Sequence, residues 1–324
     1  MIPVSIVGCG LIGGKRASAL PAGFEVVSLF DPVSERAQTL SGQLGGRPAV
    51  CSELATAVDR ASGGVAIVAT THDALAGGAL AALDAGCDIL VEKPGGKNVD
   101  ETRAIALRAS ELGRVVAVGF NHRFHPSIRD AHSIIDNERL GPILFIRARY
   151  GHGGRLGYET EWRCDRRRSG GGELIDQGVH LIDLARYFAG DLQLSYAALD
   201  TMFWPIEVED NAFLHLRAED GGHAWLHASW TEWKNLFSFE IMCKNVKIEI
   251  NGLGGSYGPE RLAVHRMSAQ LGPPTVTTVE YPPGDSSWSR ELDDFAARRR
   301  GEPSVGASID DAVATLTIVE EAYR

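Results

Sequence analysis

The first 120 residues alternate between short apolar runs and segments with helical periodicity. The apolar runs at residues 2–7, 24–30, 64–69, 88–91 and 114–119 have the length and composition of buried strands. Strands that alternate with helices predict a parallel sheet with helices on both faces. The helices are expected at residues 15–20, 54–61, 74–85 and 100–112.

The pattern changes near residue 119. A helix is expected at residues 126–138 and a strand at 142–150, and a series of strands follows residue 188. Successive antiparallel strands predict a large open sheet with one face covered by helices. We expect the strands at residues 192–199, 211–216, 223–230, 237–243, 244–250 and 261–266, and closing helices at 288–300 and 308–324.

Residues 173–188 form a predicted helix that is apolar on most of its surface, which is typical of a buried helix. Its polar row is Asp176, His180, Asp183 and Tyr187, and buried polar groups need partners. Asp176 and His180 are four residues apart, so α-helical geometry would bring a carboxylate beside an imidazole, as in a general base. The alternative is a core histidine that is satisfied by its neighbours.

A glycine motif follows the first strand directly. Gly8, Gly10 and Gly13, with Leu11 and Ile12 between the last two, form G-x-G-x-x-G ahead of a helix. The glycines allow a tight turn, close approach of backbone to a pyrophosphate, and close packing of helix on strand. This context predicts a Rossmann dinucleotide site, with phosphate at the N-terminus of the helix.

The second strand ends at Asp31, which lies 31 − 13 = 18 positions after the third glycine. A carboxylate at about this spacing binds the adenosine ribose and repels a 2′-phosphate, so we expect NAD rather than NADP. Arg36 lies near enough to tolerate a 2′-phosphate, and Asp31-Pro32 is also compatible with a simple turn.

Ligands bind at the carboxyl ends of parallel strands, where several polar residues of this chain are expected. Lys93 precedes Pro94, which stiffens the turn after the strand. Lys93 can then donate to a substrate oxygen and stabilise developing negative charge. The candidate contacts with the cofactor at these strand ends are Thr70, Thr71, His72, Glu92 and Lys93.

Composition excludes several classes of protein. A net charge of −10 argues against a nucleic-acid binder. Five scattered cysteines without a C-x-x-C pair predict neither a metal site nor a disulfide framework, and they fit a reducing cytoplasm. The N-terminal residues do not read as a signal peptide, and no apolar run reaches membrane-spanning length.

Four motifs in register resemble the Gfo/Idh/MocA family, named after glucose–fructose oxidoreductase, inositol dehydrogenase and a rhizopine-catabolism protein. They are Gly8 to Gly13, Glu92-Lys93-Pro94, Gly119-Phe120-Asn121-His122-Arg123-Phe124 and Asp176-Gln177-Gly178-Val179-His180. The resemblance implies an α/β fold with an N-terminal Rossmann doubly wound parallel sheet in residues 1–119. A C-terminal α+β domain with the open sheet would take residues 120–324, and the last helix could return to the first domain.

The resemblance also implies an NAD(P)-dependent oxidoreductase that acts on a secondary alcohol or ketone of a sugar, sugar nucleotide or cyclitol. His180 would remove the hydroxyl proton, Asp176 would orient it, and Lys93 would donate to the oxygen; relatives leave open an exchange of the His180 and Lys93 roles. Asn121 and Arg123 would line the junction of cofactor and substrate. Similar proteins are commonly homodimers or homotetramers through the sheet. An NAD-retaining glycosidase and a non-catalytic NAD-binding regulator are the alternatives on this fold.

An arginine-rich loop lies between residues 151 and 168. Arg155, Trp162 and Arg163 are candidate substrate contacts, because arginine holds phosphate or carboxylate groups in a fork. This hypothesis favours a phosphorylated or nucleotide-linked sugar. The alternative is a solvated loop whose arginines pair with Glu159, Glu161 and Asp165.

Overall fold

The computed structural model describes residues 1–270 and 272–324. Contacts divide the chain into two compact units. The first unit contains residues 1–121, 167–170 and 288–316, and the second contains residues 122–166, 171–287 and 317–324. The first unit therefore includes a C-terminal stretch as well as the predicted N-terminal domain.

The first unit contains a parallel sheet with the strand order β3-β2-β1-β4-β5-β6. This order reverses direction at β1, as in doubly wound dinucleotide-binding folds. The prediction of a Rossmann sheet is therefore confirmed. The strands are β1 (Ile2–Val7), β2 (Phe24–Phe30), β3 (Ala49–Val50), β4 (Val65–Val68), β5 (Asp88–Glu92) and β6 (Val116–Gly119).

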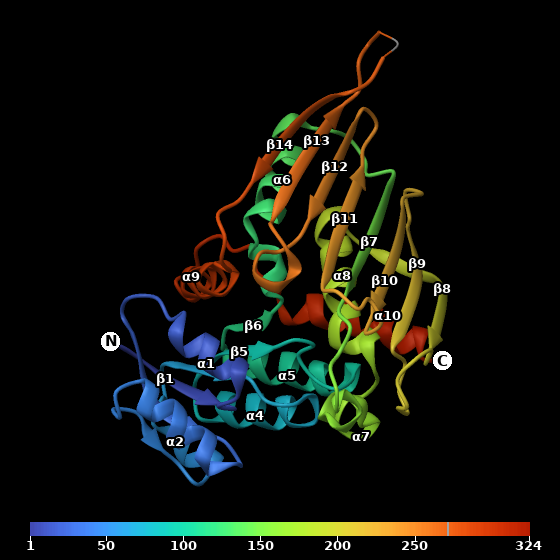
Figure 1. Cartoon of the computed structure of the whole chain (residues 1–324). Helices are drawn as coiled ribbons and strands as arrows, with labels where there is room; N and C mark the ends of the chain where they lie inside the picture. Colours follow the sequence, from blue (N-terminus) through green and yellow to red (C-terminus); the bar gives the residue numbers. More distant parts are fainter. Residues whose placement is uncertain (271) are drawn as a thin grey trace. The chain divides into compact units, whose positions relative to one another are not determined.

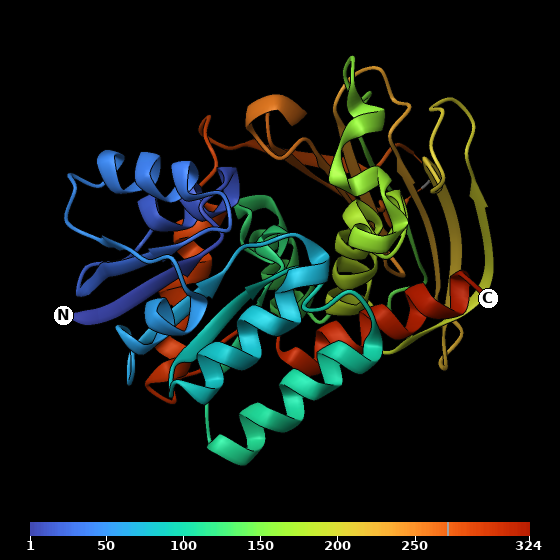
Figure 2. The same ribbon diagram turned by 90° about the horizontal axis from the view of Figure 1, so that it is seen from below.

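Helices lie on both faces of this sheet (Figure 2). One face buries Ile6 and Ile67 against Ala17, Leu40 and Phe295, which come from three different helices. The helices of this unit are α1 (Leu11–Ser18), α2 (Ser34–Gln43), α3 (Leu54–Asp59), α4 (His72–Asp84), α5 (Val99–Leu112) and α9 (Ser287–Arg299), and α10 (Ile309–Ala322) begins in it. The sequence did not predict α2, because only three of its ten residues are buried and its apolar pattern is weak.

The second unit is a large sheet with the order β14-β13-β12-β11-β7-β10-β9-β8 (Figure 1). Its neighbours pair antiparallel except β7 with β10, which pair in parallel. The predicted open, mostly antiparallel sheet is confirmed. The strands are β7 (Phe145–Gly151), β8 (Leu192–Asp200), β9 (Asn211–Ala218), β10 (His223–Ser229), β11 (Leu236–Met242), β12 (Val246–Asn251), β13 (Arg261–Arg266) and β14 (Thr275–Glu280).

One face of this sheet packs against α6 (Pro126–Glu138) and α8 (Val179–Ala189). Alternate residues of β11 and β12 are buried on that face, as the period-two pattern predicts. Among the described elements of this unit, no helix covers the opposite face. That face carries Trp225, which is 53% exposed.

The helix predicted at 173–188 is only partly an α-helix. Residues Leu174–Gly178 form a π-helical turn, and α8 begins at Val179. The prediction of one continuous α-helix is therefore wrong at its first turn. A short helix, α7 (Arg166–Ser169), precedes it. Single π-turns occur frequently at functional sites, because they shift the side chains around them.

Candidate active site

The glycine turn between β1 and α1 is built so that backbone can approach a ligand. Gly8 has φ +93°, and a Cβ there would lie 2.4 Å from the carbonyl oxygen of Ala69. A Cβ on Gly13 would lie 2.0 Å from the Gly8 oxygen. At Gly10, by contrast, none of the described heavy atoms lies within 4 Å of the Cβ position. The first and third glycines are thus required for packing, while the second leaves open space for a ligand.

The same turn offers unsatisfied donors. Gly10 is the N-cap of α1 and makes no side-chain capping bond, and the first turn of α1 has no acidic residue. The free N–H groups and the positive end of the helix dipole therefore favour an anion such as a pyrophosphate. The residues present fit the dinucleotide that the sequence predicts.

Asp31 lies at the end of β2 with its carboxylate held by backbone. One oxygen accepts a hydrogen bond from the Cys9 N–H and the other from the Val33 N–H, each at 2.8 Å. The Arg36 Nη1 atom is 3.9 Å from Asp31 Oδ1, and that arginine side chain is 61% exposed. A buried, fixed carboxylate at this strand end is the feature that favours NAD over NADP.

Replacing Asp31 with asparagine is expected to weaken NAD binding about tenfold and to narrow the preference over NADP. The substitution removes the negative charge and turns an amide N–H₂ towards a backbone N–H. Titration calorimetry with both nucleotides measures the change. Asp59→Asn, at an exposed aspartate of the same unit, serves as the control. If Asp31→Asn left the ratio of the NAD and NADP affinities unchanged, the role of Asp31 in selecting NAD would be contradicted.

Other predicted cofactor contacts also occupy strand ends in the first unit. Thr70 and Thr71 are half-buried after β4, and His72 begins α4 with its Nδ1 2.8 Å from the Ser169 carbonyl oxygen. Glu92 ends β5, and Lys93 follows it in a turn whose bond to Pro94 is cis. The carboxyl ends of β1, β2, β4 and β5 thus carry the predicted cofactor residues along one edge of the sheet.

His180 lies in the first turn of α8 and is buried. Its ring stacks on the ring of His122 with a centroid distance of 3.8 Å and an interplanar angle of 26°. The Tyr150 ring meets His122 edge-on at 5.0 Å, and burial raises the pKa of Tyr150 well above its usual range, so its phenol stays neutral. The sequence analysis did not single out His122, although it lies between Asn121 and Arg123 in a recognised motif.

Asp176 lies in the π-helical turn, so the four-residue α-helical geometry used to pair it with His180 does not describe this segment. Its Oδ2 atom accepts a hydrogen bond from Arg163 Nε at 3.0 Å. The nearby Asp176 charge raises the pKa of Arg163, and the guanidinium also stacks over Trp162 at 4.7 Å. The Asp176 carboxylate is therefore bound by Arg163, a residue of the same unit that the sequence analysis predicted as a substrate contact.

Glu209 fixes the start of the π-helical turn. One of its carboxylate oxygens accepts hydrogen bonds from the Gly172 N–H at 2.9 Å, the Leu174 N–H at 3.1 Å and the Tyr323 hydroxyl at 2.7 Å. A carboxylate at this position neutralises the positive end of the helix and satisfies its free donors. The contacts orient the segment that carries Asp176 and His180.

Arg123 forms a buried two-point ion pair with Asp183. Its Nε lies 2.8 Å from Oδ2 and its Nη2 lies 2.6 Å from Oδ1. Asn121, which starts the same 3₁₀ turn, is also buried, at 5% exposure. The guanidinium of Arg123 is thus bound by a carboxylate of α8, and its contact with substrate stays a prediction.

Two arginines of the arginine-rich loop that were predicted to bind substrate form ion pairs with acidic side chains. Arg155 pairs with Glu161, and Arg163 pairs with Glu161 at 3.2 Å as well as with Asp176. These acids neutralise the arginines that favoured a phosphorylated substrate. Substrate binding by Arg155, Trp162 and Arg163 stays a prediction.

In residues 1–270 and 272–324, no group of three or more His, Cys, Asp or Glu side chains is placed to hold a metal ion. Across the same residues, every helix is too short or too polar to cross a membrane.

The doubly wound sheet, the glycine turn and the fixed Asp31 define a dinucleotide-binding protein. Residues 2–120 match a family model described as the oxidoreductase family with an NAD-binding Rossmann fold, and residues 128–256 match the GFO/IDH/MocA C-terminal domain. The chain belongs to the Gfo/Idh/MocA family, as the four motifs predicted. It is an oxidoreductase with an NAD-binding domain.

Two curated proteins with similar sequences have related but different activities. D-glucoside 3-dehydrogenase of Escherichia coli is 25% identical over 76% of this chain and 72% of the relative. The 1,5-anhydro-D-fructose reductase of Ensifer adhaerens is 30% identical over 68% of this chain and 65% of the relative. Among solved structures, levoglucosan dehydrogenase in complex with NADH and levoglucosan superimposes with a TM-score of 0.87 at 24% identity, covering 99% of this chain and 97% of that one. The last similarity confirms the fold.

Proposed function

We propose that the protein is an NAD-dependent dehydrogenase that oxidises a secondary hydroxyl of a sugar or cyclitol. The proposal rests on the position of Lys93. This lysine directly follows β5, at the same edge of the sheet as the strand ends that carry the predicted NAD contacts. The names of the relatives, which include glucoside, glucose-6-phosphate and inositol dehydrogenases, support a polyol ring as substrate. Because Arg155 and Arg163 pair with acids, an uncharged ring is preferred to a phosphorylated one.

The residues of the chain take distinct roles in this proposal. The glycine turn and Asp31 bind NAD, which accepts a hydride when it is bound. His180 takes the proton of the substrate hydroxyl on an imidazole nitrogen. Asp176 stabilises the imidazolium electrostatically, and Lys93 donates a hydrogen bond to the oxygen as it becomes a carbonyl. Proton transfer of this kind typically contributes about 10²–10⁴-fold to a rate.

A panel assay tests the proposal. Enzyme freed of bound nucleotide is mixed with NAD and a series of glucosides, anhydro-sugars, inositols and sugar phosphates, and absorbance of NADH is followed. We expect turnover with at least one neutral ring polyol and none when NAD is withheld. Cleavage of a glycoside by protein that keeps its own bound nucleotide, with no net NADH formed, would favour the glycosidase alternative. NAD binding without turnover of any compound would favour a regulator.

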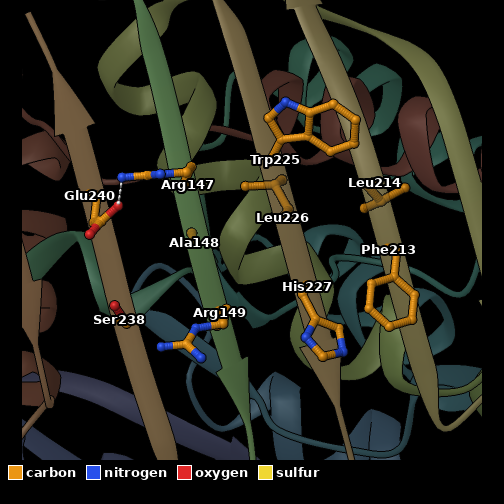
Figure 3. A pocket seen from close by; sticks show the side chains of 10 residues that line it. All are labelled: Arg147, Ala148, Arg149, Phe213, Leu214, Trp225, Leu226, His227, Ser238 and Glu240. Carbon is orange, nitrogen blue, oxygen red and sulfur yellow. Dashed lines mark ion pairs between the residues drawn. The ribbon is translucent and has the colours of Figure 1, made fainter.

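We also propose that the protein is a homodimer through the uncovered face of the second unit's sheet. An open depression of about 470 Å³ lies on this face, lined by Arg147, Arg149, Phe213, Trp225 and His227 among others (Figure 3). The dimer is proposed because a two-fold interface must be self-complementary, and charges of both signs alternate across these strands.

The alternating charges form a row across four strands. Arg147 pairs with Glu240 at 2.6 Å, and Glu240 pairs with Lys247 at 3.0 Å. Lys247 in turn pairs with Glu249, which accepts from His265 at 3.0 Å. Beside this row, Trp225 stacks on His215 at 4.2 Å and remains half exposed. Exposed aromatic area next to satisfied ion pairs is typical of an interface.

Replacing Trp225 with arginine is expected to shift the particle from dimer to monomer, because it places a charge at the apolar centre of the depression. Light scattering coupled to size exclusion measures the mass. Leu107, which is 64% exposed on α5, provides the matched control as Leu107→Arg. A wild-type protein that is already monomeric, or a Trp225→Arg variant that keeps the dimer mass, would contradict the proposed interface.

A further inference from the structure

A buried cluster of charges lies behind the predicted cofactor site in the first unit. Arg16 of α1 is fully buried, and its Nε donates to Glu92 Oε1 at 2.6 Å. Its Nη1 lies 2.5 Å from Glu291 Oε2 of α9, and its guanidinium stacks over Trp288 at 4.6 Å. One arginine thus joins three elements: the helix after the glycine turn, the strand that ends before Lys93, and α9.

The cluster occupies space that the sheet leaves for it. Gly119 pairs with Glu92 in the register of β6 and β5. A Cβ on Gly119 would lie 2.7 Å from Arg16 Nη2 and 2.9 Å from Glu92 Oε2. Any other residue at position 119 would push the ion pair apart. This close fit indicates that the contact between Arg16 and Glu92 is a specific part of the fold.

The cluster holds one positive charge and two carboxyl groups. Both carboxyl groups are buried, with side-chain exposures of 10% for Glu92 and 3% for Glu291. Keeping two buried carboxyl groups ionised beside a single guanidinium costs free energy. A proton on one of them removes most of that cost. The pKa of Glu291 is raised to about 7, because burial and the charges of Glu92 and Asp294 together outweigh the opposing effect of Arg16. Lys15 Nζ also lies over the Trp288 ring, 4.9 Å from its centroid.

We propose that Arg16 is a positioning residue that ties the glycine turn to the Glu92–Lys93–Pro94 turn, and that Glu291 holds the proton which makes this arrangement stable. Arg16 reaches Lys93 through its neighbour in the chain, Glu92. The Arg16 guanidinium then fixes the position of the glycine turn relative to Lys93, and all three belong to the first unit. The kinetic part of this inference rests on the proposed function, whereas the proton on Glu291 does not.

The first arm of the test measures the stability of the protein without nucleotide between pH 5 and pH 8. A carboxyl group whose pKa is higher in the folded than in the unfolded state destabilises the fold as pH rises between the two values. Glu291→Gln imitates the protonated form. We therefore expect the melting temperature of Glu291→Gln, relative to wild type, to increase steadily from pH 5 to about pH 7. A difference that stays constant over this range would overturn the proposed proton.

The second arm replaces Arg16 with lysine, which keeps the charge but cannot bridge two carboxyl groups in a fork. We expect kcat at saturating NAD to fall tenfold or more, while the Kd for NAD changes less than threefold. Arg108→Lys is the matched control, since Arg108 also binds two acids, Asp84 at 2.7 Å and Glu111 at 2.9 Å, but is 40% exposed. An Arg16→Lys enzyme with wild-type kcat would overturn the positioning role.

The two arms separate the two ways to fail. If no substrate is found, the proposed function fails, and the stability arm still decides the protonation of Glu291. If a substrate is found, Arg16→Lys behaves as Arg108→Lys does and the Glu291→Gln difference stays constant with pH, the proposed function stands and the cluster is structural only.

Discussion

His180→Asn is expected to lower kcat by about 10²–10⁴-fold while the Kd for NAD stays within twofold of wild type. The imidazole is buried and stacked on His122, so its loss removes the proposed proton acceptor without touching the glycine turn or Asp31. Steady-state rates at saturating NAD, together with calorimetric NAD titration, separate the two effects.

A control in the same unit distinguishes this loss from general damage. His132 of α6 is half-buried and pairs with the exposed Asp136 at 3.0 Å, so His132→Asn should retain wild-type kcat. If His180 accepts the proton, the acidic limb of the wild-type kcat/KM profile should vanish in His180→Asn. If the limb persists there and vanishes in Lys93→Met instead, lysine transfers the proton. A His180→Asn enzyme with a kcat within threefold of wild type would remove His180 from the mechanism.

Arg123→Met is expected to destabilise the protein by roughly 3–5 kcal/mol. The substitution leaves the carboxylate of Asp183, whose side chain is 1% exposed, buried without the arginine that binds both of its oxygens. It also removes the packing of the guanidinium over Tyr187, at 5.0 Å. Urea denaturation followed by circular dichroism measures the change in the free energy of unfolding.

An exposed pair in the same unit provides the comparison. Arg261 and Glu280 form an ion pair at 2.7 Å in which both side chains are 55% exposed, so Arg261→Met should cost less than about 1 kcal/mol. The double variant Arg123→Met with Asp183→Leu should recover part of the loss, because no buried charge is then left alone. Equal losses in Arg123→Met and Arg261→Met would show that the buried fork adds nothing beyond a surface pair.

The parts of the fold that the sequence predicted well are those in which one local rule suffices. The five strands recognised in the N-terminal part are short apolar runs, of which β4 and β6 are buried throughout, and the glycine motif fixes the position of α1. Strand β14 was missed for the opposite reason: all six of its residues are exposed, so burial imposes no apolar alternation on it. Its place in the sheet comes from pairing with β13, which the local sequence does not record.

The site shows a similar division. Motif spacing identified Asp31, Lys93, Asp176 and His180 as candidates. The structure places Asp31 and Lys93 directly after β2 and β5, Asp176 in the π-helical turn and His180 in α8. Motif spacing did not reveal the partners of these residues, because those partners are distant in the chain. Arg163 reaches Asp176 across 13 residues, His122 stacks on His180, and Arg123 binds Asp183 across 60 residues. The π-helical turn was also hidden, since an α-helix and a π-turn share the same apolar pattern.

Isotope transfer tests the central claim most directly. A substrate found in the panel is prepared with deuterium on each ring carbon and converted with unlabelled NAD, and the NADH is analysed by mass spectrometry. The account predicts one deuterium per NADH formed and a lower kcat than with unlabelled substrate. NADH without deuterium, or product formed while all the nucleotide remains NAD, would contradict direct hydride transfer from a ring carbon to the cofactor.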